Sequence, residues 1–466
     1  MPPDPGASSL YDLDRRHVFH PFTSIAEQQA VGPRIITGGR GVWIRDAEGR
    51  EYLDAMAGLW CVNVGYGREE IAQAMADQAR RLSYYHAFLG FANEPAIRLA
   101  QRLAEITPPG MDRFFFCNSG SEAVDTAVKL VWYYWNLRGL PEKKKIIARR
   151  DAYHGVTLGA GSVSGLPMLH AAFDLPLPGF LHARKPHFYR EGHPGESEDA
   201  FARRLADELD ALIEAEGPET VGAFIGEPLM AAGGVIPPPE GYWQAVQPVL
   251  RHHDVLLIAD EVVCGFGRLG TPFGSHRYEI EPDLMTVAKA ITSGYFPVSA
   301  AVVSERVWDV LASASAERGP FAHGHTTSLH PVGAAVALAN LDIIEREGLV
   351  DRAARLGPSF QRHLREAVAD HPLVGEVRGD GLIAAVELVA DRESRSPFPT
   401  EARAGMRLHK LLLEDGLICR ALGDSLAFSP PLVIEETEIE DALQRFGRGL
   451  ERLAATLRAE GRWKDR

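Results

Sequence analysis

The sequence predicts an α/β protein with a large, mostly parallel β-sheet and a second, smaller α+β domain. From about Arg113 onward, short apolar runs alternate with segments of helical periodicity. The runs are apolar at successive positions, so they predict strands that are buried on both faces, as in a parallel sheet covered by helices on both sides. The predicted strands span residues 113–116, 145–148, 221–225, 255–259, 284–288 and 298–303.

The segment ahead of this sheet is predicted to form a small antiparallel meander followed by helices. Residues 34–54 contain short β-branched runs separated by Gly-Gly and Glu-Gly turns, which is typical of such a meander. Residues 69–82 and 94–106 place apolar side chains at helical spacing. A further helix is expected from Ser121. The first ten residues are rich in proline, glycine and serine, and we expect them to be mobile.

The C-terminal part of the chain is predicted to form the smaller domain. A long helix over residues 332–346 leads out of the parallel sheet, and strands are expected within 379–388 and 417–431. The meander is assigned to the same domain because the α/β pattern starts only after it. The predicted units are 1–58, an N-terminal part of the small domain, 59–344, the large α/β domain, and 345–466, the C-terminal part of the small domain.

Composition narrows the class of protein. The 466 residues are 45 % hydrophobic and 24 % charged, and 49 basic against 63 acidic residues give a net charge of −14. This balance argues against nucleic-acid binding and against docking on an anionic membrane. The four cysteines form no CxxC pair, no signal peptide is evident, and nowhere do about 18 apolar residues run together. We therefore expect a soluble, cytoplasmic protein.

Residues 118–123 form a candidate anion site. Their sequence, NSGSEA, follows an aromatic run and opens the helix expected from Ser121. Backbone N–H groups at the start of a helix bind phosphate, and two serine hydroxyls add donors. A capping role for Ser119 or Ser121 explains the same pattern. The pattern is not GxGxxG, which argues against a nicotinamide-dependent oxidoreductase.

Asp260 and Lys289 form a second candidate site. Each follows an apolar strand, and the carboxyl ends of parallel strands are where such sheets bind ligands. A desolvated lysine is a nucleophile, and a carboxylate at the same edge can hold a pyridinium nitrogen in its charged form. A capping aspartate and a surface lysine would explain each residue taken alone. The order of anion site, acid and lysine on three strand ends is the more specific signal.

These motifs together resemble the class III pyridoxal-phosphate aminotransferases of fold type I. The resemblance is carried by NSGSEA, YHG, GEP, ADEVVCGFGR and TVAKAITSGY, and it runs from about Phe19 to about Glu440. Two further stretches, AGLWCVNVGYG and GLICRALGD, are similar to the omega-aminotransferases of the amine or β-alanine:pyruvate type. The resemblance implies a pyridoxal 5'-phosphate enzyme rather than a binding or scaffold protein that lacks catalysis.

The resemblance also implies roles at the cofactor. Lys289 matches the lysine that binds the cofactor covalently and later moves the substrate proton, and Asp260 matches the acid that bonds the pyridine nitrogen. Tyr153 and Val262 match the residues on the two faces of the ring, although Tyr153 could instead be a core aromatic. The remaining matches are Ser119, Gly120 and Ser121 at the phosphate, Thr326 reaching it from the neighbouring subunit, and Glu227 behind the ring.

The substrate pocket is implied in the same way. Arg420 matches a mobile arginine that pairs with the carboxylate of the acceptor through two parallel hydrogen bonds. The same side chain must move aside for an amine without a carboxylate. An aromatic pocket suits apolar or arylalkyl amines. The pocket residues implied are Phe22, Leu59, Trp60, Phe88, Tyr153 and Arg420.

The chain departs from the family pattern in two segments. Residues 323–331 read HGHTTSLHP, where the family usually has HGFTYSGHP, so His325, Thr327 and Leu329 differ. Met230 follows the GEP motif where the family usually has glutamine. These departures bear on substrate choice rather than on the cofactor. Histidines 323, 325 and 330 lack a carboxylate or cysteine at a metal-ligand spacing, so no metal is predicted, and His154 is given no catalytic role.

The predicted function is transfer of an amino group from an amine or omega-amino acid to pyruvate or a similar oxo acid, by a ping-pong mechanism. The alternative is another class III enzyme, an aminomutase or a decarboxylating transaminase, because the cofactor performs the chemistry and the site selects the bond that breaks. The predicted partners are the two small substrates. A homodimer, or a dimer of dimers, is implied through Thr326 and Phe88.

Overall fold

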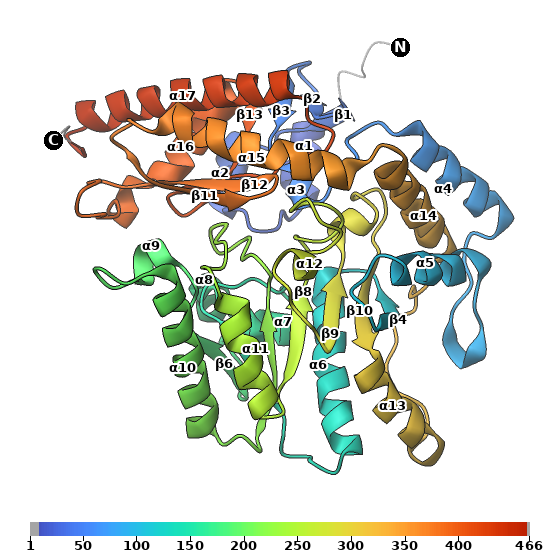
Figure 1. Cartoon of the computed structure of the whole chain (residues 1–466). Coiled ribbons are helices and arrows are strands. Elements are labelled where there is room, and N and C mark those ends of the chain that lie inside the picture. The colour runs from blue at the N-terminus through green and yellow to red at the C-terminus, as the bar shows by residue number, and fades with distance from the viewer. Residues whose placement is uncertain (1–8, 464–466) are drawn as a thin grey trace.

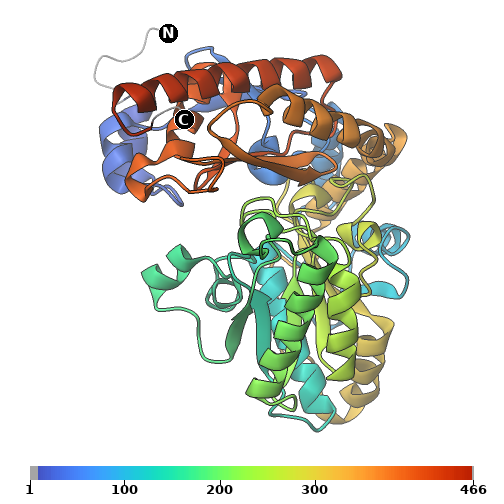
Figure 2. The same ribbon diagram turned by 60° about the vertical axis from the view of Figure 1, so that its left-hand side comes forward.

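The structure is a computed structural model that describes residues 9–463. The mobility expected for the first ten residues concerns mainly a segment outside this range. Two views show the central sheet in the lower half and the N-terminal and C-terminal elements together in the upper half (Figures 1 and 2). No helix among the described residues is long and apolar enough to cross a membrane.

A seven-stranded sheet forms the centre of the lower half, in the order β4-β10-β9-β8-β7-β5-β6. Five neighbouring strands, from β9 to β6, are parallel, and β10 runs antiparallel to both β9 and β4. The bounds are β4 Met111–Cys117, β5 Lys145–Arg149, β6 Phe180–Ala183, β7 Val221–Gly226, β8 Leu256–Asp260, β9 Leu284–Val287 and β10 Ser299–Ser304. All six predicted strands are present, and β6 is an additional edge strand.

Both faces of this sheet are buried, as the apolar runs predicted. Ile258 and Ile225 pack with α6 (Gly120–Leu137) on one face. Leu257 and Phe224 belong to the other core, with α10 (Glu198–Glu216) and α11 (Tyr242–His252). The other helices of this region are α4 Glu69–Arg81, α5 Glu94–Ala104, α7 Leu158–Val163, α8 Pro167–Phe173, α9 Phe188–Glu191, α12 Gly274–Arg277, α13 Glu305–Arg318 and α14 Pro331–Arg346, with short η1 Phe88–Gly90 and η2 Lys289–Ile291.

The upper half contains two four-stranded sheets, β1-β2-β3-β13 and β11-β12-β15-β14. The predicted meander is β1 Ile36–Arg40, β2 Trp43–Asp46 and β3 Glu51–Asp54, and β3 pairs in parallel with β13 (Leu417–Ile418). The other strands are β11 Val374–Asp380, β12 Ile383–Leu388, β14 Arg420–Leu422 and β15 Ser425–Phe428. The helices are α1 Leu10–His17, α2 Ile25–Val31, α3 Ala57–Trp60, α15 Leu349–Val368, α16 Ala404–Glu414 and α17 Glu436–Ala459, with short η3 Thr400–Ala402.

Residues 379–388 hold the end of one strand, a turn and a second strand. β11 and β12 pair antiparallel, and Gly381 between them has a φ of 54°. Glycine adopts this conformation without the steric cost that a Cβ brings. Residues 417–431 likewise contain three short strands. The domain boundaries at residues 58 and 344 stay predictions.

Candidate active site

A cavity of about 590 Å³ lies at the carboxyl ends of the central strands. It collects residues from both halves of the molecule. All but two of the predicted site residues line it: Phe22, Leu59, Trp60, Ser119, Gly120, Ser121, Tyr153, Glu227, Asp260, Val262, Lys289 and Arg420.

Lys289 lies just beyond β9, where the chain turns into η2. Its backbone has a φ of 48°, so the strand direction is broken sharply at this residue. Burial lowers the pKa of the Lys289 ammonium, against the opposing attraction of Asp260. A lowered pKa increases the fraction of neutral amine, which is the nucleophilic form.

Asp260 is the last residue of β8 and is held by three partners. One oxygen, Oδ1, accepts hydrogen bonds from the backbone N–H of Val262 (3.1 Å) and from Thr286 Oγ1 (3.0 Å). The other, Oδ2, lies 2.6 Å from Nδ1 of His154, whose buried side chain has no partner at Nε2. A carboxylate is an acceptor, so Nδ1 is the donor in this contact. Sequence reasoning gave His154 no role, although its place in the YHG motif was a usable signal.

Glu227 follows β7 and is almost fully buried. Its carboxylate accepts hydrogen bonds from the backbone N–H groups of Tyr153 (3.3 Å) and Ala231 (2.7 Å). Burial raises the pKa of Glu227, and nearby His154 opposes that rise. Glu227 thus joins the loop that carries Tyr153 to the loop that follows β7.

The start of α6 forms the candidate anion site. Ser119 is the N-cap, and its hydroxyl accepts from the N–H of Glu122 at 3.2 Å, so the capping interpretation holds for this residue. Ser121 Oγ accepts from the N–H of Val156 at 3.1 Å. A Cβ on Gly120 would lie 3.3 Å from Val262 Cγ1. The lack of a side chain here lets the first turn of α6 approach the cavity closely.

Arg420 and Trp60 meet on the wall of the cavity. The guanidinium carbon lies 5.1 Å from the centre of the Trp60 ring. Burial lowers the pKa of Arg420. Among the described residues, no carboxylate forms an ion pair with this guanidinium. The cavity therefore presents an unpaired cation beside an aromatic face.

The remaining two predicted residues, Thr326 and Phe88, lie outside the cavity lining and near each other. Tyr84 donates to the carbonyl oxygen of Thr326 at 2.7 Å. Phe88 lies so close to Gly324 that a Cβ there would be 2.9 Å from its ring. Phe88 is 43 % exposed. Both residues are thus exposed at the surface of this subunit.

The histidines of the 323–331 segment have separate environments. His323 Nε2 lies 2.9 Å from Thr126 Oγ1, and burial beside Lys129 lowers the pKa of His323 to about 4. His330 caps α14 by accepting from the N–H of Val332. His325 has no partner at Nε2. The three side chains do not form a metal-binding group among the described residues.

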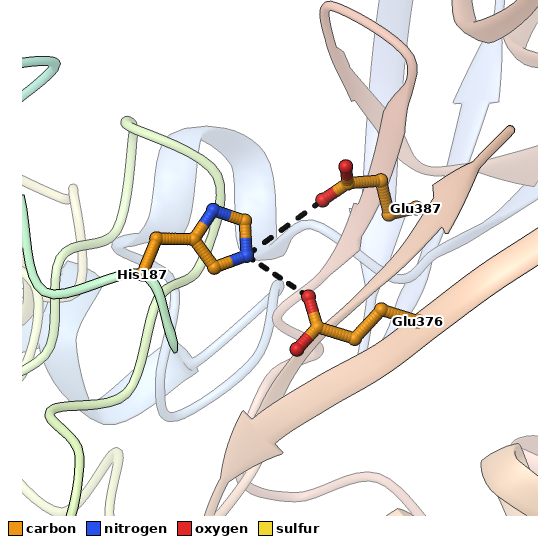
Figure 3. A group of neighbouring side chains, drawn as sticks. All are labelled: His187, Glu376 and Glu387. Carbon is orange, nitrogen blue, oxygen red and sulfur yellow. Dashed lines mark hydrogen bonds and ion pairs between the residues drawn. The ribbon is translucent and has the colours of Figure 1, made fainter. Parts of the chain in front are cut away.

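A different cluster has the residue types of a metal site, namely His187, Glu376 and Glu387 (Figure 3). His187 Nε2 lies 2.9 Å from Glu376 Oε2 and 3.8 Å from Glu387 Oε2. The same two oxygens accept hydrogen bonds from Arg378 Nη1. Arg378 also donates to the carbonyl oxygen of Gly234, close to the cavity residue Ala232. The guanidinium already supplies the positive charge, so the cluster is an ion-pair network that ties β11 and β12 to the cavity loop.

The fold and this cavity are those of a fold type I pyridoxal-phosphate transferase. A family model described as aminotransferase class-III matches residues 24–450. The chain therefore belongs to the class III aminotransferase family, whose members use pyridoxal phosphate. It is an aminotransferase that acts by transferring an amino group.

Individual relatives agree with this assignment. The chain is 47 % identical to a diaminobutyrate–2-oxoglutarate transaminase of Halomonas elongata, over 97 % of this chain and 98 % of the relative. It is 45 % identical to a putrescine–pyruvate aminotransferase of Pseudomonas aeruginosa, over 96 % and 97 %. It superposes on the omega transaminase of Pseudomonas jessenii in complex with PMP with a TM-score of 0.94, at 48 % identity over 96 % and 99 % of the two chains.

Proposed function

We propose that this aminotransferase moves an amino group from an amine or omega-amino acid to pyruvate or a similar oxo acid, in two half-reactions. The observation that carries the proposal is the unpaired guanidinium of Arg420 in a cavity that ends at Lys289 and Asp260. A guanidinium binds a carboxylate through two parallel hydrogen bonds, and the aromatic face of Trp60 suits an apolar amine. One cavity can thus accept both substrates in turn.

The residues present fit pyridoxal phosphate. The cofactor, when bound, supplies an electron sink for the carbanion that forms at the substrate carbon. Lys289 would hold it through its amine, and Asp260, oriented by His154, would hold the positive charge on its ring nitrogen. Tyr153 and Val262 would cover the two faces of the ring. The other groups proposed to hold the cofactor are Ser119, Gly120, Ser121 and Glu227, with Thr326 from the neighbouring subunit.

In this proposal Lys289 transfers the proton. Once its amine is free, Nζ accepts the proton from the substrate carbon that carries the amino group and returns it later in the same half-reaction. The lowered pKa favours the neutral amine that this step needs. Closure of the cavity by the neighbouring subunit would exclude water from the reacting carbon.

The assembly and compartment are part of the proposal. We infer a homodimer or a dimer of dimers, because the family resemblance assigns Thr326 and Phe88 to a cavity that they do not line in their own subunit. His325, Thr327, Leu329 and Met230, where the chain departs from the family pattern, do not line the cavity in their own subunit. All four cysteines are free, which supports a reducing compartment such as the cytoplasm.

A visible absorption spectrum of the purified protein with pyridoxal phosphate tests the proposed function. We expect a yellow band that bleaches when an amine is added without pyruvate and returns when pyruvate is added. The band and its two changes report both half-reactions. A protein that remains colourless after incubation with pyridoxal phosphate would refute the role of Lys289. A bleached band that 2-oxoglutarate restores and pyruvate does not would refute the acceptor.

A further inference from the structure

The turn that carries Trp60 into the cavity has an unusual backbone. It follows β3, and Ala57, Gly58 and Trp60 have φ values of 49°, 67° and 60°. Positive φ is unfavourable for a residue with a side chain, most of all for a bulky one. Such a conformation persists only where the surroundings over-determine it. Contacts from neighbouring groups must therefore hold this turn in its conformation.

Asp54, the last residue of β3, is the main anchor. Its Oδ1 accepts from the backbone N–H of Met56 at 2.9 Å, and its Oδ2 accepts from the N–H of Gly58 at 2.6 Å. Tyr66 donates its hydroxyl to the same Oδ2 at 2.5 Å. Asp54 is 1 % exposed. Two of its three bonds go to the strained turn itself, and the third fixes the carboxylate.

The anchored turn forms part of the cavity wall. Leu59, Trp60 and Cys61 all line the cavity directly after the bonded residues. Trp60 is almost fully buried, and its indole N–H has no hydrogen-bond partner. No polar contact of its own therefore fixes the ring, although Arg420 lies over it. The position of the ring depends on the backbone of the turn.

We propose that Asp54, together with Tyr66, is a positioning residue that determines amine specificity. Asp54 touches neither the substrate nor the cofactor. It holds the turn at residues 56–60 so that Trp60 sets the width of the amine pocket. This inference deepens the proposed function and rests on it for the identity of the substrate. The geometry of the turn itself is independent of any activity.

Neighbouring strands offer a matched control. Asp46, at the end of β2, accepts hydrogen bonds from the same kinds of groups as Asp54. It accepts two backbone N–H groups, from Glu48 at 3.0 Å and Arg50 at 2.9 Å, and the hydroxyl of Tyr52 at 2.7 Å. The turn that Asp46 holds, residues 46–50, contributes no residue to the cavity lining. Asp46→Asn thus removes the same kind of contacts without reaching Trp60.

The first measurement is the rate at which iodoacetamide alkylates Cys61 in the cofactor-free protein. Cys61 is partly exposed and the other three cysteines are buried, so this thiol is the one expected to react. Asp54→Asn should raise the rate at least about 5-fold by loosening the turn, and Asp46→Asn should change it less than about 2-fold. Tyr66→Phe should also raise the rate, and it leaves the Asp54 side chain in place. It is also the milder variant if Asp54→Asn fails to fold.

The second measurement compares kcat/KM for a small amine, 2-aminobutane, and a bulky one, 1-phenylethylamine. Asp54→Asn should shift the ratio of the two values at least about 5-fold, because the pocket wall moves while Lys289 and Asp260 stay in place. Equal losses for both amines, or the same shift in Asp46→Asn, would overturn the specificity role. Unchanged alkylation in both Asp54→Asn and Tyr66→Phe would overturn the positioning. Failure of the proposed function is a separate result, seen as no turnover of either amine by the unaltered protein.

Discussion

Replacing Arg420 by alanine should separate the two half-reactions. In the structure the guanidinium faces the cavity beside Trp60, and no carboxylate of the described residues pairs with it. An oxo acid would therefore supply its anionic partner. Hydrogen bonds to charged groups contribute about 1.5–3 kcal/mol each. The pair would be bidentate but lies in a cavity still open to water. We therefore expect Arg420→Ala to lose about 3 kcal/mol of transition-state stabilisation with pyruvate.

That free energy predicts a fall of roughly 150-fold in kcat/KM for pyruvate. An amine without a carboxylate makes no such pair, so its kcat/KM should change by less than about 3-fold. Arg420→Lys keeps a positive charge but not the planar guanidinium. Its kcat/KM for pyruvate should therefore lie between those of Arg420→Ala and the unaltered protein. Burial already lowers the pKa of Arg420, so removing this cation should not destabilise the fold.

Stopped-flow absorption measures each half-reaction separately, with the amine bleaching the yellow band and pyruvate restoring it. Arg113→Ala is the control, because Arg113 also lies over a tryptophan, Trp308 at 5.5 Å, and neither residue lines the cavity. It should alter neither half-reaction. Equal losses in the two half-reactions of Arg420→Ala would refute the acceptor-binding role of this residue.

Three other predictions concern the cofactor and stability. Lys289→Ala should give no yellow band and no turnover, while its circular dichroism matches that of the unaltered protein. Gly155 has a φ of 135°, and a Cβ there would lie 2.5 Å from Ser121 Oγ, so Gly155→Ala should weaken cofactor binding in a spectroscopic titration. Gly179→Ala, also at a positive φ (92°) but with open space around it, should not weaken cofactor binding. Burial raises the pKa of Glu261 from its ordinary value of 4.5 to about 7, so the free energy of unfolding should fall as pH rises between these values. Urea denaturation of Glu261→Gln at pH 4.5 and pH 8 should show a smaller fall in the free energy of unfolding between these two pH values. A fall as large as that of the unaltered protein would show that Glu261 does not titrate in this range.

Most of the central sheet could be predicted because its strands are apolar on both faces. The missed strand, β6, is four residues long, contains His182 and lies at the edge of the sheet, so it lacks that signature. The antiparallel direction of β10 could not be predicted either, because an apolar run indicates that a strand is buried but not which way it runs. β11 begins at Val374, ahead of the predicted segment 379–388, and its mostly half-buried residues form no continuous apolar run.

The site followed largely from motifs at strand ends. The contact between His154 and Asp260 joins residues 106 positions apart, and local sequence carries no record of it. The role of Asp54 could not be predicted from the sequence either, because it depends on the backbone conformation of the turn after β3. Thr326 and Phe88 lie outside the cavity of their own subunit, so their assignment depends on a second chain.

The pairing of β3 with β13 has a consequence for synthesis on the ribosome. Leu53 of β3 pairs with Leu417 of β13, so roughly 360 further residues must be synthesised before this pair can form. At 5–20 residues per second this takes about 20–70 seconds. Throughout that time one edge of the meander has no strand beside it, and open edges invite pairing with other chains. A nascent chain that stalls before β13 would thus carry an open strand edge and be prone to aggregate.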